Sequence, residues 1–186
     1  LNALLMAEFL GYEFVDAKDL IVFGADKKYD QAATYKLLKA FADNRLDSTK
    51  GIVGPGFYGA TADGNIVTFP RGGSDITGAI LAAGLKADLY ENWTDVPGIL
   101  MADPRIVDNP KAIARVTFSE LRELSYMGAD VLHQETVFPV RKKNIPLYIK
   151  DANNLNAPGT LIMEDFPPDP TEDGFKFITG ISGKKS

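Results

Sequence analysis

The sequence contains no cysteine and a single histidine, His133. Without cysteine the chain has no disulfide framework, no thiolate metal site and no cysteine nucleophile. Neither a Ser-His-Asp pattern nor a metal-ligand spacing surrounds His133, so we assign it a structural role and predict no metal site. A reducing, cytoplasmic setting fits this composition.

A positive net charge and long apolar runs are also absent. The 20 basic and 25 acidic residues give a formal net charge of −5, which offers no electrostatic basis for binding nucleic acid. No apolar run approaches the ~20 residues that span a bilayer, so we expect no membrane association. A hydrophobic content of 45% over 186 residues instead fits one soluble globular domain with a small-molecule partner.

Helical and strand-like patterns alternate along most of the chain, which is typical of a three-layer α/β sandwich around a mainly parallel central sheet. The expected helices cover residues 1–13, 29–47, 74–85 and 117–129 and a short segment ending at Val140. The expected strands lie at residues 13–15, 20–23, 88–93, 145–152 and 158–164 and within 51–69. This count predicts a sheet of more than five strands, with Trp93 in the core.

Four local signals predict where elements begin or turn. Asp30 is expected to cap the second helix and Ser74 the third, because short polar side chains accept hydrogen bonds from the first free amides. Thr117 and Glu120 have the spacing of a capping box. Asp63-Gly64 predicts a tight hairpin.

Both ends of the sequence resemble cuts. The apolar spacing of the first helix begins at Leu1 without a cap or lead-in, so we expect a truncated N-terminus. Near the other end, the proline-rich FPPDPTEDG, residues 166–174, predicts a linker. FKFITGIS, from Phe175, then begins a new strand-like alternation. We therefore expect one domain over residues 1–165 and the start of another over residues 175–186.

The segment PRGGSD, residues 70–75, carries the strongest chemical signal. Glycines that lead into a helix place free backbone amides and the positive end of the helix dipole where an anion can bind. Arg71 adds a guanidinium that grips a carboxylate or phosphate at two points, and Asp75 adds a carboxylate that suits an ammonium group. Such a pair fits a zwitterion. A surface ion pair beside an ordinary helix cap explains the same residues, and the pattern leaves both interpretations open.

Two further clusters are candidates for ligand contact. The glycines of GPGFYG, residues 54–59, surround Phe57 at the end of a strand, where a ligand can approach the backbone, although turn glycines are the alternative. In WTDVPGILMADPR, Thr94 and Asp95 can hydrogen-bond a nucleotide and Arg105 can reach its phosphates. Taken alone, this segment is a polar loop.

The stretch from Gly56 to Val107 closely resembles the aspartokinase family, a branch of the amino-acid kinase fold. Its GFYG, PRGGSDIT, WTDVPG and ADPRIV match the family patterns GFxG, GRGGSD-x-T, WTDVxG and ADPR-x-V in order and spacing. GADVLH and NIPLYIKDANNLNAPGTLI continue the likeness over nearly the whole chain. The resemblance implies a carbamate kinase-like fold, with a partial catalytic domain over residues 1–165 and the start of a regulatory ACT-like domain over residues 175–186.

By this resemblance the reaction is phosphoryl transfer from MgATP to the side-chain carboxylate of L-aspartate. The product is 4-phospho-L-aspartate, at the first step of lysine, threonine and methionine biosynthesis. The implied partners are L-aspartate and ATP with Mg²⁺, and the relatives commonly form homo-oligomers. A kinase of another amino acid in the same fold, or a non-catalytic fragment that binds ATP or a partner, are the alternatives.

The family's functional residues carry over position by position. Arg71 is implied to hold the aspartate α-carboxylate, and Asp75 to engage its ammonium or order a catalytic lysine. Phe57 and Ser74 are implied to line the substrate pocket. The implied nucleotide contacts are Thr94, Asp95, Leu100, Arg105 and Val131.

The chain departs from the family pattern at several places. Leu100 stands where many members have Tyr, and Gln134 where many have Pro. Asp130 stands where many have a nucleotide-contacting Lys, so we assign Asp130 no phosphate contact. The N-terminal KFGGTS segment with its phosphate-binding lysine, and a substrate-binding Glu expected before Leu1, are absent. We therefore expect the 186 residues alone to lack kinase activity.

Overall fold

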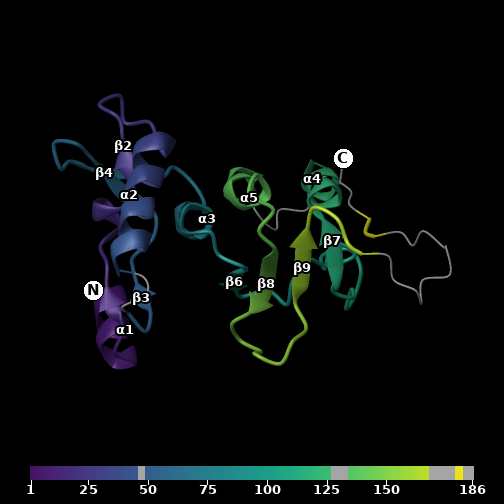
Figure 1. Ribbon diagram of the computed structural model, residues 1–186. Coiled ribbons are helices and arrows are strands. Elements are labelled where there is room, and N and C mark those ends of the chain that lie inside the picture. Colours follow the sequence, from purple (N-terminus) through teal and green to yellow (C-terminus); the bar gives the residue numbers. More distant parts are fainter. Residues whose placement is uncertain (46–48, 127–133, 168–178, 182–186) are drawn as a thin grey trace. The chain divides into compact units, whose positions relative to one another are not determined.

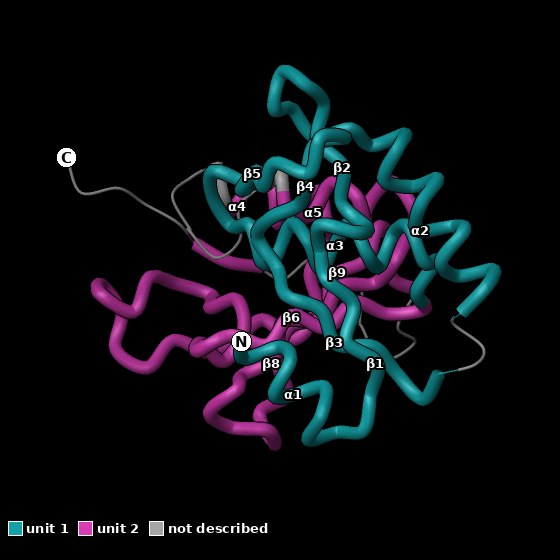
Figure 2. Tube along the Cα trace, turned by 90° about the vertical axis from the view of Figure 1, so that its left-hand side faces the viewer, with its two compact units in different colours: residues 1–87 teal, residues 88–186 magenta. Residues whose placement is uncertain are grey.

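Residues 1–45, 49–126, 134–167 and 179–181 are described in a computed structural model of the chain (Figure 1). The chain divides into two compact units, Leu1–Ala87 and Asp88–Ser186, which Figure 2 distinguishes by colour. Each unit has its own strands, helices and buried side chains. Within the described ranges, no helix is long and apolar enough to cross a membrane.

The first unit alternates short strands with helices. Its helices are α1 (Asn2–Leu10), the 3-10 helix η1 (Ala17–Asp19), α2 (Gln31–Arg45) and α3 (Gly73–Leu85). Its strands are β1 (Glu13–Phe14), β2 (Val22–Phe23), β3 (Ile52–Val53), β4 (Tyr58–Thr61) and β5 (Ile66–Thr68). β1 pairs with β3 and β2 with β4 in parallel, and β4 forms an antiparallel hairpin with β5.

The core of the first unit joins α2 and α3 to the short strands. Ile21, Leu38 and Ile80 are at most 1% exposed and belong to one apolar cluster. Leu38 of α2 packs so closely on Gly84 of α3 that an added Cβ at Gly84 would overlap its side chain. This contact fixes α3 on the core, and with it the loop that leads into the helix.

The second unit is built on one four-stranded sheet with the order β6-β8-β9-β7. Its strands are β6 (Tyr90–Thr94), β7 (Arg115–Thr117), β8 (Leu147–Asp151) and β9 (Thr160–Met163), and its helices are α4 (Phe118–Tyr126) and α5 (Gln134–Arg141). β6 is parallel to β8 and β7 to β9, whereas β8 and β9 are antiparallel. Helix α4 packs beside α5 and against β7 and β9 (Figure 1).

Successive side chains of a strand point to opposite faces of the sheet. In this sheet one face is buried and the other is more exposed. Asn92, Leu147 and Ile149 are buried on one face. On the other face Trp93 is 42% exposed, and Lys150 Nζ lies 4.7 Å from the centre of the Trp93 ring. The prediction that Trp93 packs in the core is therefore wrong, since the alternation places Asn92 inward and Trp93 outward.

Three of the local signals are confirmed. An Asp30 carboxylate oxygen accepts a hydrogen bond from the Ala33 amide at 2.9 Å, as a helix cap does. Thr117 and Glu120 exchange the two hydrogen bonds of a capping box, at 2.8 Å and 3.2 Å. Gly64, with φ of 82°, turns the β4–β5 hairpin.

Two expectations need correction. Ser74 does not cap α3, because the cap is Gly72, two residues earlier, and Ser74 already lies in the first helical turn. The described strands form three separate sheets of two, three and four strands, not one continuous sheet. Four of the six described strand pairings are parallel, so the α/β class with mainly parallel strands is confirmed.

Candidate active site

The start of α3 carries the charged residues of the PRGGSD motif. Gly72 has a left-handed conformation, with φ of 55°, and its carbonyl accepts a hydrogen bond from the Ile76 amide at 2.8 Å. Glycine suits this position because other residues adopt such a φ only at a cost. Asp75 lies in the first helical turn, where the helix dipole favours a carboxylate.

Arg71 stands just before this helix cap. Its side chain is exposed and makes no ion pair or hydrogen bond with another described residue. The sequence pattern left open a surface ion pair between Arg71 and Asp75. The ion pairs of the described residues do not include this pair. The guanidinium of Arg71 is accessible to a ligand.

The loop that carries Phe57 is tied to the same helix start. Phe57 has φ of 70°, and its amide donates a hydrogen bond to Thr77 Oγ1 at 3.0 Å. Its carbonyl accepts a hydrogen bond from the Phe69 amide at 2.9 Å. A left-handed conformation costs a non-glycine residue roughly 1–2 kcal/mol and persists only where the surroundings fix it. Here the two hydrogen bonds hold the Phe57 backbone, and its ring is half exposed.

Two glycines let this loop approach the helix. A Cβ at Gly73 would lie 2.8 Å from Phe57 Cβ, and a Cβ at Gly56 would lie 3.0 Å from Ser74 Cα. Both distances are shorter than the usual contact between carbon atoms, ~3.5–4.0 Å. A side chain at Gly73 would therefore displace Phe57, and one at Gly56 would press on Ser74, so this close packing brings Phe57 next to the helix turn that contains Ser74.

In the second unit, two predicted nucleotide contacts lie at the carboxyl ends of β6 and β8. The parallel strands β6 and β8 end side by side at Thr94 and Asp151, and the Ala152 amide donates to the Thr94 carbonyl at 2.7 Å. The Thr94 hydroxyl donates to an Asp95 carboxylate oxygen at 3.3 Å. Ligands of α/β proteins commonly bind outside the carboxyl ends of parallel strands. This edge offers hydroxyl and carboxylate oxygens to a polar ligand.

The loop after β6 is held by a buried threonine of β9. Gly98 turns the chain with φ of 123°, and the buried Ile99 donates its amide to Thr160 Oγ1 at 2.8 Å. The Thr160 hydroxyl donates in turn to the Ile113 carbonyl at 2.6 Å. Leu100 directly follows Ile99, so the same contacts set its position.

Arg105 forms a two-point ion pair with Asp103. Arg105 Nη2 lies 2.7 Å from Asp103 Oδ2, and Arg105 Nε lies 3.0 Å from Asp103 Oδ1. The hydrogen bonds from Arg105 hold the pKa of Asp103 below its ordinary value, and Asp103 raises the pKa of Arg105. Asp103 Oδ1 also accepts a hydrogen bond from the Arg105 amide at 2.8 Å, a short-range contact that turns the chain.

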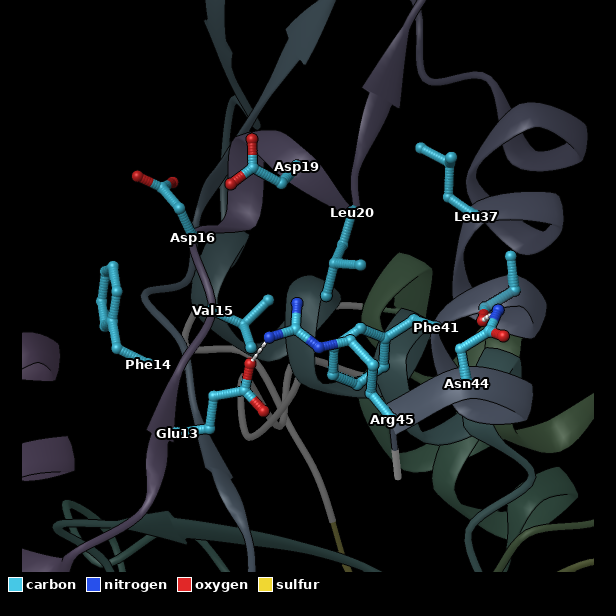
Figure 3. A pocket seen from close by; sticks show the side chains of 11 residues that line it. Glu13, Phe14, Val15, Asp16, Asp19, Leu20, Leu37, Phe41, Asn44 and Arg45 are labelled. Carbon is cyan, nitrogen blue, oxygen red and sulfur yellow. Dashed lines mark hydrogen bonds and ion pairs between the residues drawn. The ribbon is translucent and has the colours of Figure 1, made fainter. Parts of the chain in front are cut away.

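A separate pocket of about 410 Å³ opens in the first unit between β1, η1 and α2 (Figure 3). Phe41 contributes to its apolar lining, and Glu13 and Arg45 form an ion pair beside it. The Asp16 carboxylate accepts a hydrogen bond from the Tyr58 hydroxyl at 2.7 Å. Burial, with this bond, raises the pKa of Tyr58 to about 12, so the hydroxyl keeps its proton. The predicted site residues do not line this pocket, and these polar groups satisfy one another.

The structure therefore gathers Phe57, Arg71, Ser74 and Asp75 around the start of α3, and places Thr94, Asp95, Leu100 and Arg105 at and after the carboxyl end of β6. Their roles stay predictions. Val131 lies outside the described residues, as do Asp130 and His133.

The sequence reasoning missed Thr77 and Thr160 as functional candidates. A signal was available, because each stands within an apolar segment, TGAIL or TLI, where a buried hydroxyl must find hydrogen-bond partners. Thr77 is 2% exposed and Thr160 is fully buried.

Comparison with known proteins gives consistent matches. The model of the amino acid kinase family matches residues 1–151. Aspartokinase 3 of Bacillus subtilis is 42% identical over 170 residues, which cover 87% of this chain and 37% of the relative.

Solved structures agree with this match. The aspartate kinase of Clostridium acetobutylicum superposes with a TM-score of 0.79 at 51% identity, over 87% of this chain and 36% of that chain. Aspartokinase III of Escherichia coli in complex with aspartate and ADP superposes with a TM-score of 0.79 at 32% identity, over 89% of this chain and 38% of that chain. The resemblance found in the sequence motifs is confirmed, and the fold is that of these kinases.

Proposed function

The chain belongs to the amino acid kinase family, and we propose that the polypeptide containing it is an aspartokinase. The proposed reaction transfers the γ-phosphoryl group of MgATP to the side-chain carboxylate of L-aspartate and yields 4-phospho-L-aspartate, the first step of lysine, threonine and methionine biosynthesis. Similarity to aspartokinases supports this proposal. Because the chain spans 36% to 38% of the length of the three relatives, the activity is proposed for the complete polypeptide that contains it.

In the proposed reaction, an oxygen of the aspartate side-chain carboxylate forms a bond to the γ-phosphorus. The bond from that phosphorus to the β,γ-bridging oxygen breaks, and ADP leaves. Such transfers depend on positioning and charge neutralisation more than on covalent catalysis. The residues of this chain would bind and orient the two substrates.

The arrangement at the start of α3 carries the proposal for aspartate. The exposed guanidinium of Arg71 suits the α-carboxylate, which it can contact at two points. Asp75, in the first turn of α3, is proposed to engage the ammonium group or to order a catalytic lysine. Phe57 and Ser74, brought together by the close packing of loop and helix, would line the pocket.

The carboxyl end of β6 is proposed to bind the nucleotide. Thr94 and Asp95 supply a hydroxyl and a carboxylate there, and Leu100 offers an apolar contact to the base. The ion pair of Arg105 uses Nε and Nη2, so the proposed phosphate contact falls to Nη1. Val131 is proposed to contribute backbone contacts.

Mg²⁺ is expected to enter with ATP. Within the described ranges, no three His, Asp or Glu side chains gather closely enough to hold a metal ion. A magnesium ion bound largely through substrate phosphates and water fits this donor set, because Mg²⁺ keeps several waters and binds few carboxylates.

The wider assignments are part of the same proposal. We propose a cytoplasmic homo-oligomer, with a linker over residues 166–174 and an ACT-like regulatory domain that starts within residues 175–186. Leu1, the residue before α1, is 91% exposed and Phe9 of α1 is 85% exposed, an apolar surface that other segments of the complete polypeptide or a second copy would cover.

Arg71→Ala in the complete polypeptide tests the function. Calorimetry should show aspartate affinity falling about 10- to 100-fold, because a charge-assisted hydrogen-bond pair is lost. The ATP affinity of the variant should stay within about twofold of that of the unsubstituted protein, because no hydrogen bond to ATP is lost. Arg122→Ala is the matched control, because Arg122 is an exposed arginine of α4 paired with the adjacent Glu123.

The outcomes separate the alternatives. Equal loss of aspartate and ATP binding in Arg71→Ala would overturn the role assignment. Turnover with glutamate in preference to aspartate would indicate a kinase of another amino acid. ATP binding without aspartate-dependent release of ADP would indicate a non-catalytic protein.

A further inference from the structure

Two buried threonines, one in each unit, make the same pattern of hydrogen bonds. Each hydroxyl accepts a hydrogen bond from a loop amide and donates one to a backbone carbonyl. For Thr77 the partners are the Phe57 amide at 3.0 Å and the Gly73 carbonyl at 2.7 Å. For Thr160 they are the Ile99 amide at 2.8 Å and the Ile113 carbonyl at 2.6 Å. A hydroxyl can fill both roles at once, because it carries one proton and two lone pairs.

Thr77 connects the Phe57 loop to α3. The bond to the Gly73 carbonyl, one turn back along the helix, is common for a helical threonine. The bond from Phe57 is different, because it comes from a residue 20 positions away whose backbone is in the left-handed region. Thr77 is only 2% exposed, so bulk water does not reach its hydroxyl, and the loss of this hydroxyl would leave the Phe57 amide without its partner. Thr77 therefore fixes the Phe57 backbone relative to the helix turn that carries Ser74 and Asp75.

Thr160 plays the corresponding part in the second unit. Its hydroxyl joins Ile99 to Ile113, and the Ile113 amide closes the arrangement by donating to the Ile99 carbonyl at 2.7 Å. A Cβ at Gly98 would lie 2.6 Å from Thr160 Oγ1, so the loop sits directly on this hydroxyl. Thr160 thereby fixes the loop that runs from Asp95 to Leu100.

We propose that Thr77 and Thr160 are positioning residues, Thr77 for the amino-acid substrate and Thr160 for the nucleotide. The inference rests on the proposed function, because it takes the assignment of the two substrates from it. Neither threonine would touch a substrate. Each would hold a loop whose residues do.

The test replaces each threonine by valine, which keeps the shape and removes the hydroxyl, and by serine, which keeps the hydroxyl. In the complete polypeptide, Thr77→Val should raise the KM for aspartate about tenfold, the effect expected for one lost buried hydrogen bond. The KM for ATP should stay within about twofold of that of the unsubstituted protein, because Thr77 holds no nucleotide contact and no hydrogen bond on that side is lost. Thr160→Val should give the reverse pattern, so each variant is the control for the other. Both serine variants should restore KM values close to those of the unsubstituted protein.

Equal changes of both KM values in either valine variant, or loss of function in the serine variants as well, would overturn the inference. Should a valine variant fail to fold, hydrogen exchange in the unsubstituted protein gives a second measurement. The Phe57 and Ile99 amides should be protected, with aspartate slowing exchange at Phe57 and an ATP analogue at Ile99. Rapid exchange at both amides overturns the inference. Failure of the proposed function is distinct, since the unsubstituted protein would then bind neither aspartate nor ATP.

Discussion

Gly73→Ala is expected to disturb the candidate aspartate site through one added methyl group. The new Cβ would lie 2.8 Å from Phe57 Cβ and 2.9 Å from Phe57 Cα, so the Phe57 backbone has to move by roughly 1 Å to reach normal contact at ~3.5–4.0 Å. Overpacking of this kind costs about 1–3 kcal/mol. The higher helix propensity of alanine relative to glycine offsets about 1 kcal/mol of this cost. The free energy of unfolding should therefore fall by up to about 2 kcal/mol.

The displacement of Phe57 should matter more for catalysis than for stability. A shift of about 1 Å in a substrate-positioning group can reduce the rate about 100-fold. We expect kcat/KM for aspartate to fall about 10- to 100-fold, with the KM for ATP unchanged. Steady-state kinetics and chemical denaturation of the complete polypeptide measure the two effects side by side.

Gly84→Ala is the matched control. It adds the same methyl at the opposite end of α3, where the new Cβ meets the side chain of Leu38 in the core. Stability should fall by a similar amount, whereas kcat/KM for aspartate should not change. Equal kinetic effects in the two variants would refute the role of the Gly73 contact, and a Gly73→Ala protein with unchanged stability and kinetics would refute the packing itself.

Two further predictions concern stability. Thr34→Val should lower the free energy of unfolding by about 1–3 kcal/mol in denaturation experiments, because the fully buried hydroxyl accepts the Val22 amide at 2.9 Å and that amide would be left unpaired; Thr34→Ser should restore most of it. Thr117→Ala should cost about 1 kcal/mol by breaking the capping box. Burial alone would raise the pKa of Glu120, but the hydrogen bonds from Thr117 and Thr179 together outweigh it and lower this pKa from 4.5. The stabilisation from the ionised Glu120 is thus present above pH 4.5 and is lost as the pH falls through the lowered pKa. The difference in the free energy of unfolding between Thr117→Ala and the unsubstituted protein should therefore shrink from about pH 7 to about pH 3. A difference that stays constant over this range would contradict the assignment.

Much of the fold followed from local patterns. The cap at Asp30, the capping box at Thr117 and the turn at Gly64 were predicted because each depends on one or two side chains and their nearest backbone groups. Trp93 was placed wrongly because the alternation of side chains decides which face of the sheet it joins, and the sequence of a short strand does not show which face is covered. In the structure, Trp93 contacts Glu91 of β6 and Lys150 of β8 on the exposed face. The division of the strands among separate sheets depends on tertiary contacts and was not predictable from segment patterns.

The candidate site was predicted only in part for a related reason. Arg71 and Asp75 were found because charged residues beside glycines at a helix start are visible in the sequence. The left-handed backbone of Phe57 and the hydroxyl of Thr77 were not, because their importance lies in a hydrogen bond between residues 20 positions apart. Such contacts appear only when the chain is folded.

The exposed position of Trp93 makes it an optical reporter. It is the single tryptophan of the 186 residues, it adjoins Thr94 at the carboxyl end of β6, and its indole nitrogen donates to Glu91 at 3.2 Å while Lys150 lies over its ring. A charged ligand that arrives at Thr94 would alter the electric field and the solvent around this indole. The intrinsic fluorescence of Trp93 should therefore follow the proposed binding of a nucleotide without any label attached to the protein.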